Sequence, residues 1–205
     1  MGSRRPEGNL KGRWSSFPQG TMVTMFPALD VDGHAFRAVY GGAGGTWGPA
    51  MEVITVLGGG WSVLALAPMV WHTRTRRFAA ALTLAIVAQA VLVWSLKLAV
   101  GRVRPWIAFG LPEPIGAPRD PSFPSGHAAG SFCVAAFLAM ALPVIGPGSR
   151  WLSRTIVVGC GGVAALVAIS RVYLGAHFPS DVVAGALIGA LVGAVTAAHY
   201  AAPAR

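Results

Sequence analysis

Five long apolar segments constrain this chain more than any other feature of its sequence. They cover approximately residues 50–71, 78–100, 127–146, 152–170 and 181–200. Each is close to the roughly 20 residues that an α-helix needs to cross a bilayer. The sequence therefore predicts an all-α, polytopic transmembrane helix bundle with five clear spans, or six with an N-terminal interfacial segment.

The composition supports a membrane protein and argues against two other classes. Charged residues make up only 11% of the 205 residues, whereas soluble domains carry about 25%. The net charge of +9 comes from basic residues dispersed in short loops, without a basic stripe or a nucleic-acid motif, so no nucleic-acid partner is expected. Cys133 and Cys160 lie inside apolar runs, and no Cys/His cluster has zinc spacing, so we expect no disulfide, no metal and no cofactor.

The chain divides into an N-terminal polar or interfacial segment, residues 1–45, and a membrane-embedded domain, residues 46–205. Within the first part, residues 30–45 fit either a short interfacial helix with a Gly-rich link or a simple polar lead-in. In the last span, Gly185, Gly189 and Gly193 recur every four residues, which favours close packing inside the bundle over a dimer seam. The oligomeric state stays open.

Alternating spans place the connections on two sides of the membrane. One side carries residues 71–77, 146–151 and the C-terminus, with six arginines there or just beyond and no acidic residue. All seven acidic residues lie on or near the other side. By the positive-inside rule the acid-free side is cytoplasmic, which predicts a multi-pass protein of the plasma (inner) membrane whose other side is extracytoplasmic.

Chemically active residues gather on that extracytoplasmic side, because four span ends reach it. The set consists of Lys97, Arg102, Arg104, Ser125, Gly126, His127, Arg171, His177 and Asp181. Ionisable residues near membrane depth are costly and are functional candidates by default. Each cation alone could be an interfacial anchor, but the number of such residues on one face favours a site.

The grouping suits a phosphate. Lys97, Arg104 and Arg171 supply cations, and guanidinium groups match phosphate oxygens in pairs. Ser125 can cap the helix that follows, while Gly126 allows close approach to free backbone N–H groups.

Two histidines complete the set. His177 lies four residues before Asp181, whose carboxylate can orient the ring and leave the other nitrogen free as a nucleophile. His127, in the first turn of its helix, is placed to protonate a leaving oxygen.

Three segments carry a resemblance to a known family. KLAVGRVRP (97–105), PSGH (124–127) and SRVYLGAHFPSD (170–181) are similar, in order and in spacing, to the signature of the type-2 phosphatidic acid phosphatase superfamily. The resemblance implies that His177 forms a phosphohistidine with Asp181 as its partner and that His127 protonates the leaving group. It also implies phosphate binding by Lys97, Arg104, Ser125, Gly126 and Arg171, with Arg102 only a neighbour, no metal, and inhibition by vanadate. Family members in membranes commonly have six spans, one more than is clear here.

The expected function is therefore an integral-membrane lipid phosphatase whose substrate is a lipid phosphate in the bilayer. Candidate substrates are polyprenyl (undecaprenyl) pyrophosphate, phosphatidylglycerol phosphate, phosphatidic acid and lipid A phosphates, and an outward site favours the first. The alternatives are a lipid phosphotransferase using the same phosphohistidine, a protein like the vanadium haloperoxidases, and a non-catalytic lipid-binding protein.

Overall fold

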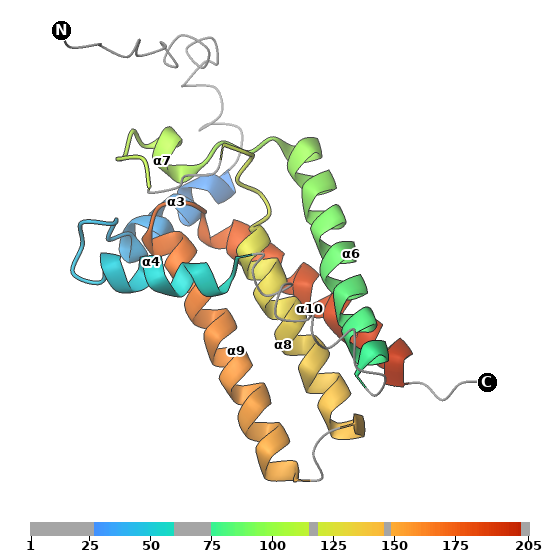
Figure 1. The fold of residues 1–205 in the computed structure, drawn as a ribbon. Coiled ribbons are helices and arrows are strands. Elements are labelled where there is room, and N and C mark those ends of the chain that lie inside the picture. Colours follow the sequence, from blue (N-terminus) through green and yellow to red (C-terminus); the bar gives the residue numbers. More distant parts are fainter. Residues whose placement is uncertain (1–26, 60–74, 115–118, 146–148, 202–205) are drawn as a thin grey trace, which may run out of the picture.

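A computed structural model describes residues 27–59, 75–114, 119–145 and 149–201. Every regular element in these ranges is a helix. They are α3 (Pro27–Val39), α4 (Gly48–Leu57), α6 (Arg76–Val100), α7 (Pro105–Ala108), α8 (Gly126–Ile145), α9 (Arg150–Tyr173) and α10 (Pro179–Ala201). Figure 1 shows α6, α8, α9 and α10 as a bundle, with α3 and α7 at one end of it.

Four of the five expected spans are confirmed as helices long and apolar enough to cross a membrane: α6, α8, α9 and α10. Their large apolar side chains remain exposed along the bundle, as for Val91 on α6, Val158 on α9 and Leu187 on α10. A water-soluble protein rarely exposes apolar surface of that extent, whereas lipid tails cover it at no cost.

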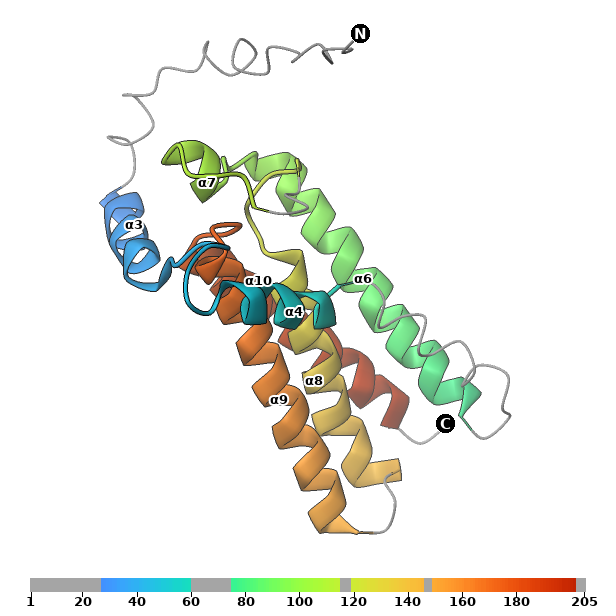
Figure 2. The same cartoon turned by 60° about the vertical axis from the view of Figure 1, so that its left-hand side comes forward.

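The first expected span, 50–71, is described only in part. Its beginning coincides with α4, which has 10 residues, and residues 60–74 lie outside the described ranges. In both views α4 runs across the bundle rather than along it (Figures 1 and 2). The predicted helix within residues 30–45 corresponds to α3, which begins slightly earlier, at Pro27.

Helices α8 and α10 pack unusually closely. A Cβ atom added at Gly185, Gly189 or Gly193 would lie only 2.3, 2.0 or 2.2 Å from a backbone carbonyl oxygen of Ser125, Ala129 or Cys133. The four-residue glycine repeat is therefore used inside the bundle, as predicted. This contact fixes the start of α10 against the start of α8.

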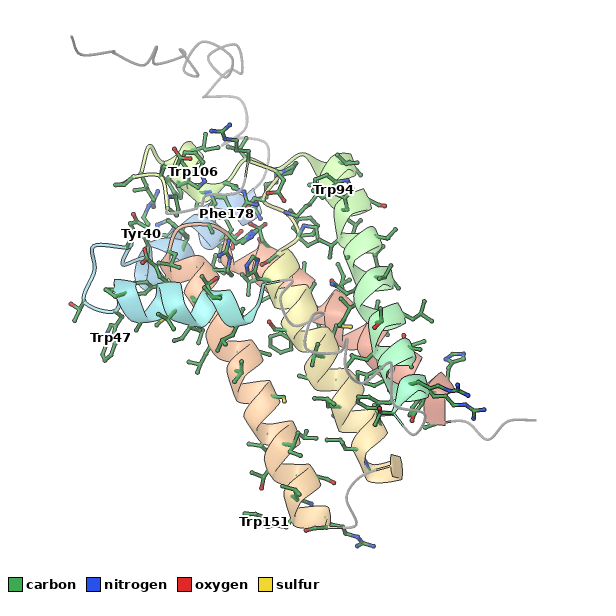
Figure 3. The ribbon with its side chains drawn as sticks, viewed as in Figure 1. Tyr40, Trp47, Trp94, Trp106, Trp151 and Phe178 are labelled. Carbon is green, nitrogen blue, oxygen red and sulfur yellow. The ribbon has the colours of Figure 1, made fainter. Side chains whose placement is uncertain are left out.

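Tryptophans mark both ends of the bundle. Trp94 lies toward the end that carries α7, Trp47 lies beside α4, and Trp151 lies at the opposite end of the bundle, on α9 (Figure 3). All three are more than half exposed. Indole rings concentrate at membrane–water interfaces, so this distribution agrees with α9 crossing a bilayer.

Candidate active site

The helix ends that carry the predicted residues meet at one end of the bundle. The C-terminal ends of α6 and α9 and the N-terminal ends of α8 and α10 lie there together, close to α3 and α7 (Figures 1 and 2). Helix α6 ends at Gly101, whose φ is 62° and whose N–H donates to the Lys97 carbonyl. Only five residues, 174–178, join α9 to α10.

His177 lies in that connection and is almost completely buried. Its Nε2 atom is 3.3 Å from Nη1 of Arg104. A guanidinium group has only donors, so Nε2 is the unprotonated nitrogen and the ring proton resides on Nδ1. Burial, the largest effect, and the charges of Arg104 and Arg171 together lower the pKa of His177 to about 3, against the opposing effect of Asp181. The ring is therefore a neutral imidazole at physiological pH.

Asp181 is fully buried next to the protonated nitrogen. Its Oδ2 atom accepts hydrogen bonds from Ser122 Oγ (2.5 Å) and from the Phe178 N–H (2.9 Å), and it lies 3.7 Å from His177 Nδ1. Ser122 Oγ is also 3.4 Å from Nδ1, so this hydroxyl can accept from the imidazole while it donates to the carboxylate. Sequence reasoning missed Ser122, although it lies three residues before Ser125 in the same short polar run.

Two of the predicted cations share a carboxylate that the sequence reasoning did not single out. Asp120 lies 2.9 Å from Lys97 Nζ and 2.9 Å from Arg104 Nη2, and its carbonyl oxygen accepts from Arg104 Nε at 2.8 Å. Lys97 also donates to the Pro121 carbonyl. Partial burial would raise the pKa of Asp120, but the hydrogen bond from Lys97 and the two positive charges outweigh it and lower the pKa.

The third cation is held by α4. Arg171 Nη1 donates to Thr55 Oγ1 at 2.8 Å, and its buried Nε atom has no partner among the described residues. A buried guanidinium N–H without a partner leaves a donor for an anion, because such groups are normally satisfied. Thr55, 116 positions away in sequence, gave no signal that could have linked it to Arg171.

The start of α8 has the arrangement expected of an anion-binding helix end. Ser125 is buried, its N–H donates to the Asp181 carbonyl at 2.9 Å, and its Oγ lies 3.5 Å from the Ala128 N–H as a weak cap. Gly126 and His127 follow, both half-buried. His127 lies beside the end of α4, where a Cβ added at Gly58 would be 3.4 Å from its Cδ2 atom.

The structure thus brings His177 into contact with both Asp181 and Arg104, and Asp120 joins Lys97 to Arg104. Ser125 joins them through its backbone contact with Asp181, while Arg171 and His127 face α4. Arg102, predicted only as a neighbour, contacts Asp181 directly. Among the described residues no group of three His, Cys, Asp or Glu side chains could hold a metal ion.

A bundle of membrane-spanning helices defines a multi-pass membrane protein, and one end of the bundle carries a buried imidazole and the cations Lys97, Arg102, Arg104 and Arg171. The model of the PAP2 superfamily matches residues 78–203, and the chain belongs to this superfamily.

Comparison with individual proteins gives relatives that act on lipid phosphates. The chain is 39% identical over 94 residues to phosphatidylglycerophosphatase B of Bacillus subtilis (44% of this chain, 42% of the relative). It is 35% identical over 118 residues to undecaprenyl-diphosphatase of Sulfolobus acidocaldarius (56% and 52%). These matches span about half the length of the curated relatives.

The fold extends further than these sequence matches. The crystal structure of a transmembrane PAP2 type phosphatidylglycerolphosphate phosphatase from Bacillus subtilis superposes with a TM-score of 0.73 at 26% identity, covering 88% of this chain and 90% of that one. The predicted all-helical membrane fold and the predicted family are both confirmed.

Proposed function

We propose that this protein is an integral-membrane lipid phosphatase that hydrolyses a phosphomonoester or pyrophosphate headgroup through a phosphohistidine. One observation carries the proposal: the buried, neutral His177 presents its unprotonated Nε2 to the Arg104 guanidinium, 3.3 Å away, while Nδ1 faces Ser122 and Asp181. A nucleophile needs this combination of a free lone pair, an oriented ring and cations where the phosphoryl oxygens will lie.

In the first step His177 Nε2 attacks phosphorus, and the bond from phosphorus to the leaving oxygen breaks. Arg104 then donates to a phosphoryl oxygen instead of to Nε2, and Lys97 and Arg171 balance the remaining negative charge. His127 gives a proton to the leaving lipid oxygen. The Asp181 carboxylate stabilises the positive charge that the ring acquires, through Ser122 and directly.

In the second step water attacks the phosphohistidine, the N–P bond breaks, and His127 takes the proton that the water loses. Inorganic phosphate leaves and His177 returns to its neutral form. Overall, one water is consumed for each phosphate released. No metal is required, because the three cations supply the charge that metal ions supply elsewhere.

The substrate class follows from the location of the site and from the relatives. The site lies at one end of a membrane bundle, so an amphiphile can present its phosphate there while its chains stay in lipid. The relatives named for phosphatidylglycerophosphate and undecaprenyl diphosphate support either class. We propose undecaprenyl pyrophosphate first and phosphatidylglycerol phosphate or phosphatidic acid second, with the site on the extracytoplasmic face of the plasma membrane.

The test is phosphate release by the purified protein in detergent with EDTA present, over a panel of these three lipids. Wild type should release phosphate, vanadate should inhibit it, and His177→Ala should release none while remaining folded. His199→Ala, which removes an exposed histidine near the other end of α10, is the matched control and should keep full activity. Retained activity in His177→Ala, or complete loss of wild-type activity in EDTA, would overturn the proposal.

A further inference from the structure

Arg102 joins two carboxylates that come from distant parts of the chain. It follows Gly101 at the end of α6, and its side chain is mostly buried. Its Nη1 atom lies 2.6 Å from Oδ1 of Asp181, and its Nη2 atom lies 2.7 Å from Oδ2 of Asp32 on α3. The two ends of one guanidinium group therefore hold the proposed catalytic carboxylate and a carboxylate from the N-terminal segment.

Asp32 in turn holds the first turn of α10. Its Oδ1 atom accepts from the Ser180 N–H at 3.0 Å, and its Oδ2 atom accepts from Ser180 Oγ at 2.5 Å. The first N–H groups of a helix have no partner within the helix, so a carboxylate is stabilising there. Asp32 thus fixes the residue immediately before Asp181 from 148 positions away.

Aromatic packing fixes the orientation of the guanidinium group. Arg102 lies over the Phe178 ring, 4.2 Å from its centroid, and Phe178 packs against Phe36 and Phe109. Nη1 of Arg102 also donates to Ser180 Oγ at 2.6 Å. A planar group stacked on a ring and bonded at both ends has little freedom to turn, and lysine cannot reproduce this arrangement.

The Asp181 carboxylate depends on Arg102 for its orientation. Ser122 and the Phe178 N–H donate to its Oδ2 atom, whereas Nη1 of Arg102 donates to its Oδ1 atom. Without Arg102, Oδ1 would be buried without its charged partner, and the carboxylate could turn away from His177. A buried polar atom that loses its partner is destabilised by its full desolvation cost.

We propose that Arg102 is a positioning residue that keeps the Asp181 carboxylate aimed at His177, and that Asp32 on α3 holds Arg102 in place. The N-terminal helix α3 is then a working part of the active site, not a lead-in to the membrane domain. This inference rests on the proposed phosphatase function, and its test can fail separately from it.

The experiment measures kcat and KM for phosphate release from the best lipid substrate, per folded protein, in four variants. Arg102→Gln should lower kcat about 10- to 100-fold, the effect of one charge-assisted hydrogen bond, with KM changed less than about twofold. Arg102→Lys should recover only part of the loss. Asp32→Asn should lower kcat less than Arg102→Gln, and the double variant should be no slower than Arg102→Gln alone.

Matched controls remove equivalent charges at the same end of the bundle. Arg37→Gln removes an exposed arginine of α3, and Glu113→Gln removes an exposed carboxylate, and both should keep wild-type kcat. Added guanidinium ion should raise the kcat of Arg102→Ala but not that of His177→Ala. A purely structural role would not produce this rescue.

Three results would overturn the inference. The first is an Arg102→Gln kcat within twofold of wild type, and the second is an Arg102→Gln variant in which only KM changes. The third is a double variant whose loss of kcat equals the product of the losses in Arg102→Gln and Asp32→Asn. If the wild type releases no phosphate, or if His177→Ala stays active, the proposed function itself has failed. An inactive His177→Ala beside a fully active Arg102→Gln would remove only the positioning role.

Discussion

Replacement of Gly189 by alanine tests how far the candidate active site depends on the contact between α8 and α10. The added Cβ would lie 2.0 Å from the Ala129 carbonyl oxygen, where ordinary van der Waals contact begins at 3.4 Å. The obstacle is backbone within a helix and cannot rotate away. The two helices must therefore separate locally by about 1.4 Å, the difference between these two distances.

That separation acts on both parts of the proposed site. Ala129 lies in the first turn of α8, just after His127, and Asp181 lies in the first turn of α10. The Ser125 N–H bond to the Asp181 carbonyl joins the two helix starts. We expect Gly189→Ala to lower the free energy of unfolding by about 1–3 kcal/mol, as overpacking does. We expect phosphate release per folded protein to fall about 100-fold, the cost of an ångström-scale misplacement.

The assay is SDS-titrated unfolding in mixed micelles together with phosphate release. Gly162→Ala is the matched control, because Gly162 is an exposed glycine of α9 with open space around its Cβ position. It should raise stability by about 0.5–1 kcal/mol, since alanine favours a helix over glycine, and leave activity unchanged. Equal stability and activity in Gly189→Ala and wild type would refute the reasoning.

Two further predictions follow from the site's electrostatics. When the pH is lowered from 6.5 to 5.5, the free energy of unfolding should fall by about 1 kcal/mol more in wild type than in His177→Gln. The reason is that the pKa of His177 is about 3 when folded and 6.5 in the unfolded chain, so only the unfolded chain gains a proton in this window; equal pH dependence in both proteins would contradict it. Asp120→Asn should tighten inhibition by inorganic phosphate at least about fivefold, because it removes a negative charge that competes with an anion for Lys97 and Arg104. It should also lower the free energy of unfolding by about 1–3 kcal/mol, because two buried cations lose their charged partner. Unchanged inhibition would show that Asp120 does not compete.

The sequence alone determined the four long helices and the end of the bundle at which they present their polar residues. Apolar length predicts a span, and alternating spans force every second helix end onto the same side, so Lys97, Arg104, Arg171 and Asp181 had to converge. The four-residue glycine repeat of α10 also indicated that this helix packs closely against another helix of the bundle. The roles of these residues in the reaction stay predictions.

Only the tertiary structure decided which groups pair within that end. Asp120 between two cations, Thr55 on Arg171 and Asp32 on Arg102 all come from short or irregular segments outside the four spans. Such segments have no periodicity that assigns a partner, and a carboxylate in a loop can reach several cations. Which cation such a carboxylate contacts depends on how the helix ends and connections pack. That packing is a property of the whole fold and not of any one stretch of sequence.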